Sequence, residues 1–197
     1  MNVESPIATR PVGRPRDEAR TQAVLKAAAE LLAKHPFEDI TAGQIAKAAG
    51  VSTATLYRWW PSKEAVLMDG YLSSIKPQIG FRKAKTSLSS LRAQLRAVVD
   101  TLRGPQGVTL ASIVHCAQQS PALREAFLER FLMPRRAEAT ALIQQAIKDG
   151  ELRPEIDPEV LMDSLYGAIY YRLLVAHAPL TRRFVDQHMA IVFDATQ

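Results

Sequence analysis

The sequence predicts an all-α protein of about nine helices. The expected order is an N-terminal three-helix helix–turn–helix domain, a linking helix and a C-terminal helical domain. Apolar residues recur every three or four positions through most of the chain, as they do on one face of an α-helix. Serine, threonine or aspartate precedes several of these segments, and glycine or proline follows them, as expected at helix ends. Hydrophobic residues make up 47% of the 197 residues, which is enough for a folded core.

We expect three regions: a flexible basic arm at 1–16, a helix–turn–helix domain at 17–76 and a C-terminal domain at 77–197. The arm contains three prolines, which prevent regular structure, and the basic segment G-R-P-R at 13–16. Arginines on such an arm can enter the narrow minor groove of A·T-rich DNA, so Arg14 and Arg16 are candidate DNA contacts. The alternative is a solvated tail.

The first helix is expected from Asp17 to Lys34. Asp17 can cap it, and His35-Pro36 ends it because proline disfavours a helical residue before it. Its inward face is the apolar stripe Ala23, Val24, Ala27, Ala28, Leu31 and Leu32.

Two short helices follow, separated by a glycine turn. Thr41 and Gln44 form a T-x-x-Q capping box that begins the first of them. Gly50 ends it, as a residue that adopts positive φ readily. Ser52 caps the second, which is expected over 52–60.

The second short helix cannot be stable alone, so the preceding helices must support it. With Leu56 anchored inward, its outer surface carries small and hydroxyl-bearing residues and two long side chains that can contact phosphates or base edges. This is how a recognition helix is presented to the major groove of DNA. The alternative for Tyr57 is that its side chain is buried in the core. Trp60 is expected to be a core residue. The outward set is Thr53, Ala54, Thr55, Tyr57 and Arg58.

A fourth helix is expected from about residue 61 to Ile75, with Ser62 as its cap. Lys63 then lies at the positive N-terminus of a helix, which is a suitable position for contact with a phosphate. Pro77 and Gly80 mark the boundary with the C-terminal region.

The segments G-R-P-R and T-A-G-Q-I-A-K-A-A-G-V-S-T-A-T-L-Y-R-W-W-P-S-K-E-A-V-L resemble, in order and spacing, the DNA-binding domain of the TetR/AcrR family of transcriptional regulators. The resemblance covers residues 14–75. Ala54 departs from the glycine of many members, and Trp59-Trp60 departs from their histidine or tyrosine followed by phenylalanine. These departures bear on which operator is bound.

The resemblance implies that the partner is double-stranded DNA. It implies phosphate contacts for Thr41 and Lys63, a position near the DNA backbone for Trp59, and a base contact for Arg58, with guanine as the favoured base. The other residues of the implied recognition surface are Ser52, Thr53, Ala54 and Tyr57.

Further helices are expected in the C-terminal region. The long pattern that begins at Ser120-Pro121 can be interrupted at Met133-Pro134, and Leu128 is expected among its inward residues. The expected segments are 87–103, 108–119, 120–149, 160–178 and 181–195.

The segment 160–178 is apolar around most of its circumference, so it must be buried on two sides. One side can face its own domain, and the last helix and a second subunit can cover the other. In the resembled family the final two helices commonly form a four-helix homodimer interface. Such a dimer suits a palindromic operator, because two recognition helices must reach successive major grooves. The expected interface residues are Leu161, Leu165, Ile169, Leu173, Phe184, His188, Ile191 and Val192.

The resemblance also implies that an unknown small-molecule effector binds the C-terminal helices and weakens DNA binding. Inward aromatic and sulfur-containing side chains of the middle helices are the candidate ligand-binding residues, and ordinary core packing is the alternative for each of them. They are Cys116, Phe127, Phe131, Met162, Tyr166 and Tyr170.

No group of residues suggests an active site, a metal site or a cofactor. His115 and Cys116 are adjacent on a helix and point in different directions, and no third ligand has suitable spacing. The single cysteine allows no intrachain disulfide, which fits a reducing compartment. No apolar run reaches the roughly 18 residues that span a bilayer. We therefore expect a cytoplasmic protein with no membrane partner.

The net charge of +5 is compatible with nucleic-acid binding and is spread over both regions, so a DNA-binding face must be a local patch. The sequence thus favours a ligand-responsive transcriptional regulator, most simply a repressor. It would bind a palindromic operator as a homodimer and be released by a small-molecule effector. The alternative is a helical small-molecule-binding protein or enzyme whose N-terminal domain no longer recognises a specific operator.

Overall fold

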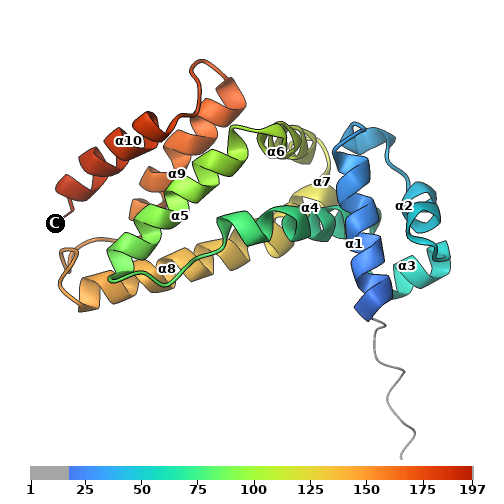
Figure 1. Cartoon of the computed structure of the whole chain (residues 1–197), viewed down its shortest axis with the longest axis horizontal. Helices are drawn as coiled ribbons and strands as arrows, with labels where there is room; N and C mark the ends of the chain where they lie inside the picture. Colours follow the sequence, from blue (N-terminus) through green and yellow to red (C-terminus); the bar gives the residue numbers. More distant parts are fainter. Residues whose placement is uncertain (1–17, 197) are drawn as a thin grey trace, which may run out of the picture.

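The computed structural model describes residues 18–196, and helices with connecting loops account for this whole range (Figure 1). The all-α prediction is confirmed. Helices α1 to α3 form one end of the molecule, α4 leads away from them, and α5 to α10 form the rest. The helices are α1 (Glu18–Leu32), α2 (Ala42–Ala49), α3 (Thr53–Trp59), α4 (Lys63–Ile79), α5 (Ser87–Leu102), α6 (Pro105–Ala117), α7 (Pro121–Phe127), α8 (Met133–Lys148), α9 (Pro158–Val175) and α10 (Arg182–Asp194).

Side-chain caps begin the short helices where the sequence predicts them. Thr41 and Gln44 form the complete capping box of α2. The hydroxyls of Ser52 and Ser62 cap α3 and α4, and each accepts a backbone N–H from the first turn of its helix. Gly50 follows α2 with a φ of 66°, in the left-handed region that favours glycine. These local features fix the turn between α2 and α3.

The crossing of α1 and α4 holds the N-terminal domain together. A Cβ atom at Gly70 would lie 2.6 Å from the Cβ of Ala28 and 3.0 Å from the carbonyl oxygen of Leu25, so this approach requires glycine. The core of this domain supports α3, which has only seven residues and depends on that support. Its most buried members include Val24, Ile45, Leu56, Trp60 and Val66.

Helix α4 extends through Pro77 to Ile79, whereas the sequence predicts its end near Ile75. Pro77 cannot donate to the carbonyl of Ser73, and both residues are exposed, so water can satisfy that carbonyl. Ile75 and Ile79 are buried and hold the last turn against the C-terminal helices. One continuous helix therefore runs from the N-terminal helices into the C-terminal domain (Figure 1), and the expected domain boundary at 76/77 falls inside it.

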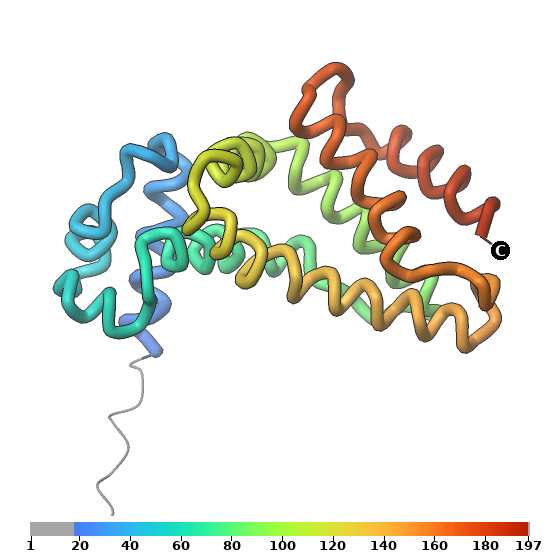
Figure 2. The backbone as a smooth tube through the Cα atoms, turned by 180° about the vertical axis from the view of Figure 1, so that it is seen from behind, coloured from blue at the N-terminus to red at the C-terminus, as the bar shows by residue number. Residues whose placement is uncertain are grey.

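A π-helical turn, Leu128–Leu132, connects α7 to α8. The three pieces form one rod that extends to the far end of the molecule (Figure 2). The interruption lies just before Met133-Pro134, because Pro134 occupies the first turn of α8, where its missing N–H is not needed. The wider turn breaks the regular helical spacing, and Leu128 is 37% exposed rather than inward as predicted.

Helix α5 lies at the centre of the C-terminal domain, where it packs against α4, α6, α8 and α10. Helix α9 packs between α8 and α10 and also touches α5 and α6. It ends at Val175 rather than at residue 178, because Ala176 adopts a left-handed φ of 54°. In Figure 1, α10 lies at the end of the molecule opposite α1 to α3.

Candidate DNA-binding surface, effector cavity and dimer face

The outer face of α3 is open to solvent. Ser52, Thr53, Ala54, Tyr57 and Arg58 are all exposed, whereas Leu56 is completely buried and anchors the helix. The Tyr57 ring is 51% exposed, so it is not a core residue. Ser52 uses its hydroxyl twice within the helix: it accepts from the Thr55 N–H at 3.1 Å and donates to Thr55 Oγ1 at 3.0 Å.

The two tryptophans at the end of α3 have different environments. Trp60 is 3% exposed, as the sequence predicts, and Trp59 is partly buried with its ring edge-on to Trp60 at 6.0 Å. The guanidinium of Arg58 lies 5.9 Å from the centre of the Trp59 ring. This is within the range of a cation–π contact, and it lies beside the outer face of α3.

Thr41 and Lys63 flank this face at the starts of α2 and α4. Thr41 is exposed, and its hydroxyl accepts from the N–H of Gln44 and donates to the Gln44 side-chain oxygen at 3.0 Å. Lys63 is partly buried, and its ammonium lies 5.2 Å from the centre of the Phe37 ring. The expected DNA contacts Arg14 and Arg16, and the expected cap Asp17, lie outside the described residues.

Asp69 of α4 connects α3 with the C-terminal domain. Its carboxylate accepts a hydrogen bond from Trp60 Nε1 at 2.7 Å and forms an ion pair with Arg130 of the π turn at 2.8 Å. The π turn is therefore linked by one side chain to the end of α3.

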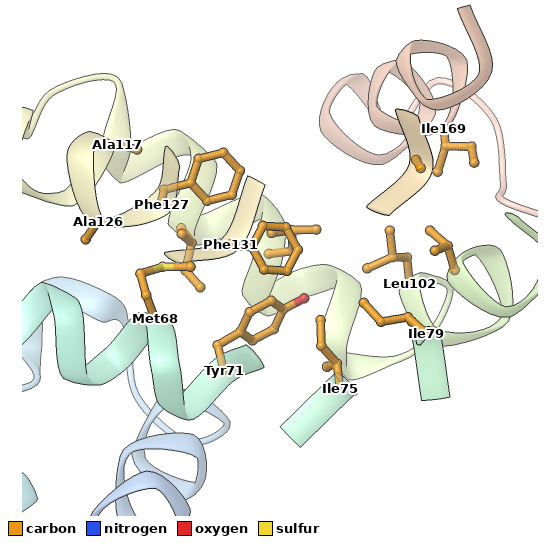
Figure 3. Packing of buried hydrophobic residues seen from close by; sticks show 14 of the residues in the cluster. Met68, Tyr71, Ile75, Ile79, Leu102, Ala117, Ala126, Phe127, Phe131 and Ile169 are labelled. Carbon is orange, nitrogen blue, oxygen red and sulfur yellow. The ribbon is translucent and has the colours of Figure 1, made fainter. Parts of the chain in front are cut away.

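A cavity of about 60 Å³ lies between the end of α4 and the C-terminal helices. Its walls are mainly apolar, and several wall side chains point toward one another from different helices (Figure 3). Four of the six residues expected to bind a ligand line it: Phe131, Met162, Tyr166 and Tyr170. The other lining residues are Ile75, Ile79, Gln94, Val98, Leu102, Leu110, Leu132, Arg135 and Arg136.

The polar groups of the cavity are concentrated around Gln94 and Arg135. Tyr166 donates its hydroxyl to Gln94 Oε1 at 2.5 Å. The amide nitrogen of Gln94 and the guanidinium of Arg135 both donate to the carbonyl of Ile79, at 3.2 and 3.0 Å. Burial raises the pKa of Tyr166 well above its usual range and that of Tyr170 to about 12. Both hydroxyls therefore remain protonated donors at neutral pH.

Cys116 and Phe127 do not line the cavity, contrary to the sequence expectation. The thiol of Cys116 donates to Glu38 Oε1 at 3.2 Å, so it lies where α6 meets the 3₁₀ turn Phe37–Asp39 of the N-terminal domain. Burial, followed by the Glu38 contact, raises the pKa of this thiol. Phe127 stacks on Phe131 at 5.4 Å, behind the cavity wall. Both residues face inward, but toward other neighbours.

Three of the expected interface residues are core residues instead. Leu161, Leu165 and Ile169 are at most 3% exposed within their own chain, because this side of α9 packs on the C-terminal core. Leu173, Phe184 and Val192 are partly buried against the same core, and His188 contacts the Ser164 carbonyl at 3.0 Å. Only Ile191, at 72%, is largely exposed.

A different side of α9 remains apolar and open to solvent. We call it the α9 face. Val160 is 62% exposed, Tyr171 58% and Leu174 44%, and outside the local backbone of α9 no atom lies within 4 Å of where a Cβ at Gly167 would be. The α9 face comprises Val160, Ser164, Gly167, Tyr171 and Leu174.

The described residues contain no group of three or more His, Cys, Asp or Glu side chains arranged to hold a metal ion. Within the same range, no helix is long and apolar enough to cross a membrane.

A short exposed helix supported by two others, joined to a helical domain that encloses a cavity, defines a helix–turn–helix transcriptional regulator. Two family descriptions match the chain: "Bacterial regulatory proteins, tetR family" over residues 24–68, and "Tetracyclin repressor-like, C-terminal domain" over residues 86–192. The chain belongs to the TetR family.

Known relatives extend over nearly the whole chain. The HTH-type transcriptional regulator YdeS of Bacillus subtilis (strain 168) is 34% identical over 185 residues, which are 94% of this chain and 93% of YdeS. The crystal structure of the TetR family transcription regulator SCO0332 has 35% identity and a TM-score of 0.79, covering 90% of this chain and 98% of that one. FadR from Bacillus subtilis in complex with stearoyl-CoA has 17% identity and a TM-score of 0.67, covering 89% and 99%. At that identity the likeness concerns the fold alone.

Gln94 and Arg135 are absent from the residues that the sequence predicts for the cavity. Gln94 carries a recognisable signal, because it is a polar residue within the apolar stripe of α5 and is only 2% exposed. Arg135 carries no such signal, because an arginine in the first turn of a helix is ordinarily a surface residue.

Proposed function

We propose that the protein is a homodimeric, ligand-responsive repressor that binds a palindromic operator through α3 and releases it when a small molecule occupies the cavity. The observation that carries this proposal is the outer face of α3. There, exposed Tyr57 and Arg58 extend from a helix whose other side is fixed by Leu56 and Trp60. A rigid, short helix with long polar side chains on its outer face suits the major groove. A regulator of this kind acts on chromosomal DNA, so we place it in the cytoplasm.

The proposed DNA contacts follow from this face. Arg58 contacts a base, with guanine favoured, and Thr53 and Ala54 allow the helix backbone to approach the groove closely. Ser52 and Tyr57 complete the recognition surface, Thr41 and Lys63 contact phosphates, and Trp59 lies near the DNA backbone. Arg14 and Arg16 of the basic arm enter the minor groove.

The properties of the α9 face support the proposal that a second subunit packs against it. Its residues are spaced alternately four and three apart, from Val160 through Gly167 to Leu174. This spacing suits side-by-side packing of two helices, and the small residues Ser164 and Gly167 allow a close approach. Ile191 of α10 is a further exposed apolar residue, on a helix that packs against α9. An exposed apolar surface of this kind typically marks an interface.

The position of the cavity supports a coupling between ligand and DNA. The last turn of α4 forms part of its wall, through Ile75 and Ile79, and the first turn of the same helix carries Lys63 beside α3. A ligand that widens the cavity would move α4 and change the separation of the two recognition helices. Such a ligand must bind the DNA-released conformation more tightly than the DNA-bound one.

The experiment that tests the proposal is a gel-shift assay with genomic fragments at several salt concentrations, comparing wild type with Arg58→Ala. Loss of one base contact should weaken binding to the preferred fragment by about 10- to 100-fold. Non-specific binding and the melting temperature should change little, because Arg58 is exposed. Arg183→Ala, at an exposed position of α10, is the matched control. If wild type binds all fragments equally or binds none, the alternative of a helical ligand-binding protein or enzyme without operator recognition replaces the proposal.

A further inference from the structure

Two neighbouring arginines at the start of α8 line the cavity but have different partners. Arg136 forms ion pairs with Glu159 and Asp163 of α9. Arg135 is partly buried, and within residues 18–196 no carboxylate lies within ion-pair distance of it. Its hydrogen-bond partner is the Ile79 carbonyl, and its guanidinium lies 5.9 Å from the centre of the Phe131 ring. A guanidinium has five N–H donors, so most of those on Arg135 remain available to a ligand.

The groups beside Arg135 are also donors. The Tyr170 hydroxyl lines the cavity and has no hydrogen-bond partner among the described residues. Gln94 is already occupied, because its oxygen accepts from Tyr166 and its nitrogen donates to Ile79. The polar end of the cavity therefore offers a cation and a hydroxyl without a hydrogen-bond partner in the described part of the chain, and the nearby carboxylate of Glu138, whose charge acts on Tyr166, forms no ion pair with Arg135. Apart from Arg136 and Tyr166, the rest of the wall is apolar and includes Val98, Leu102, Leu110, Phe131 and Met162.

We infer that the effector is a monocarboxylic acid with a compact apolar body, whose carboxylate binds Arg135 and Tyr170. This inference rests on the proposed function, because it takes the cavity as the effector site. An arginine and a hydroxyl match a carboxylate in charge and in hydrogen-bond geometry. The apolar wall matches the body of the acid. A cavity of about 60 Å³ has room for only a few water-sized groups, which favours a short or branched body over a long chain.

The same contact gives the acid an effect on α4. Arg135 donates to the carbonyl of Ile79, the last residue of that helix. A carboxylate attracts the guanidinium more strongly than a neutral carbonyl does, so the acid draws Arg135 away from the end of α4. Gln94 alone then holds the Ile79 carbonyl. Binding of the acid is in this way coupled directly to movement of α4.

The test uses matched pairs of ligands on the full-length protein. The probes are butanoate, 2-methylpropanoate and 3-methylbutanoate, each with its primary amide, and binding is measured by calorimetry and by the shift in melting temperature. At least one acid should bind wild type at least about 10-fold more tightly than its amide, since charge-assisted hydrogen bonds are lost in the amide. Arg135→Gln should reduce this preference to within about twofold. Tyr170→Phe should weaken binding of the acid and leave binding of the amide nearly unchanged.

Arg183→Gln is the matched control, because Arg183 is exposed on α10 and distant from the cavity. It should keep the preference for the acid. The inference is overturned if the amides bind as tightly as the acids, if Arg135→Gln keeps the preference, or if no acid binds. Should wild type bind a specific DNA fragment while no acid binds, the ligand class is wrong and the proposed regulator stands. Tyr170→Phe keeps the test decisive even if Arg135→Gln folds poorly.

Discussion

Tyr71, Tyr166 and Tyr170 place three hydroxyls in the electrostatic field of Arg135. Burial is the main cause that raises the pKa of each, and the positive charge of Arg135 opposes this rise. Each side chain is therefore neutral at physiological pH. The Tyr71 hydroxyl donates to the Gln106 carbonyl at 3.0 Å, which ties α4 to α6.

Burial of Tyr170 predicts a loss of stability in alkaline solution. Its pKa is about 12 in the folded chain, against the ordinary tyrosine value of 10.0 that applies in the unfolded chain. Between these values the unfolded chain loses the proton first, so the free energy of unfolding falls as the pH rises. Urea denaturation from pH 7 to 11 should show this fall, and Tyr170→Phe should make it shallower. Tyr57→Phe, at an exposed ring, serves as the control, and an unchanged slope in Tyr170→Phe would contradict the prediction.

Single residues differ in how far the sequence determines their place. Trp60 could be predicted as a core residue and Tyr57 as an outward one, because Leu56 fixes the inward side of a short helix. Cys116 and Phe131 are both inward residues, yet only Phe131 lines the cavity. The pattern within one helix identifies its buried side but does not say which partner helix that side meets.

At the scale of single helices, α9 shows most clearly that a sequence pattern does not identify the partner of each buried side. Its apolar residues surround the helix, so the sequence predicts burial on two sides without saying which side faces the core. The structure assigns Leu161, Leu165 and Ile169 to the core. The exposed α9 face is therefore the surface that a second subunit can cover.

Gly167→Arg tests this surface with little risk to the fold, since the position of its Cβ is open space. A long charged side chain in the middle of a helix–helix interface should weaken dimerisation by at least about 100-fold. Analytical ultracentrifugation should then show a dimer for wild type and a monomer for the variant at micromolar concentration. Ala122→Arg, at an exposed position of α7, should remain dimeric. A dimeric Gly167→Arg protein would show that the interface lies elsewhere.

Helix beginnings marked by a side-chain cap could be predicted closely, because a cap is a local interaction between a side chain and the next turn. The beginning of α6 could not: it lies at Pro105 rather than at residue 108, and its cap Gly104 has no side chain to mark it. Thr41, Ser52 and Ser62 all cap as the sequence indicates. Helix ends that depend on tertiary contacts could not. Pro77 is accommodated because buried Ile75 and Ile79 hold the last turn of α4 in place, and this contact comes from residues distant in the sequence.

At the scale of the whole molecule, α4 is the element that connects the helix–turn–helix end with the cavity. It carries Lys63 beside α3 at one end and Ile79 in the cavity wall at the other. The contact of Asp69 with Trp60 and Arg130 adds a second connection midway. The resemblance of residues 14–75 to a known family predicts this architecture, and the cavity and its polar end become visible only when α4, α5, α8 and α9 are placed together.

The measurement that tests the proposed function most directly is the DNA sequence that the wild-type protein selects from a random duplex library. A dimer that presents two α3 helices should enrich a palindrome whose half-sites are separated by about one or two helical turns of 10 to 10.5 base pairs. Enrichment of a single asymmetric half-site would contradict the dimeric arrangement. The absence of any enriched sequence would contradict operator recognition by α3 itself.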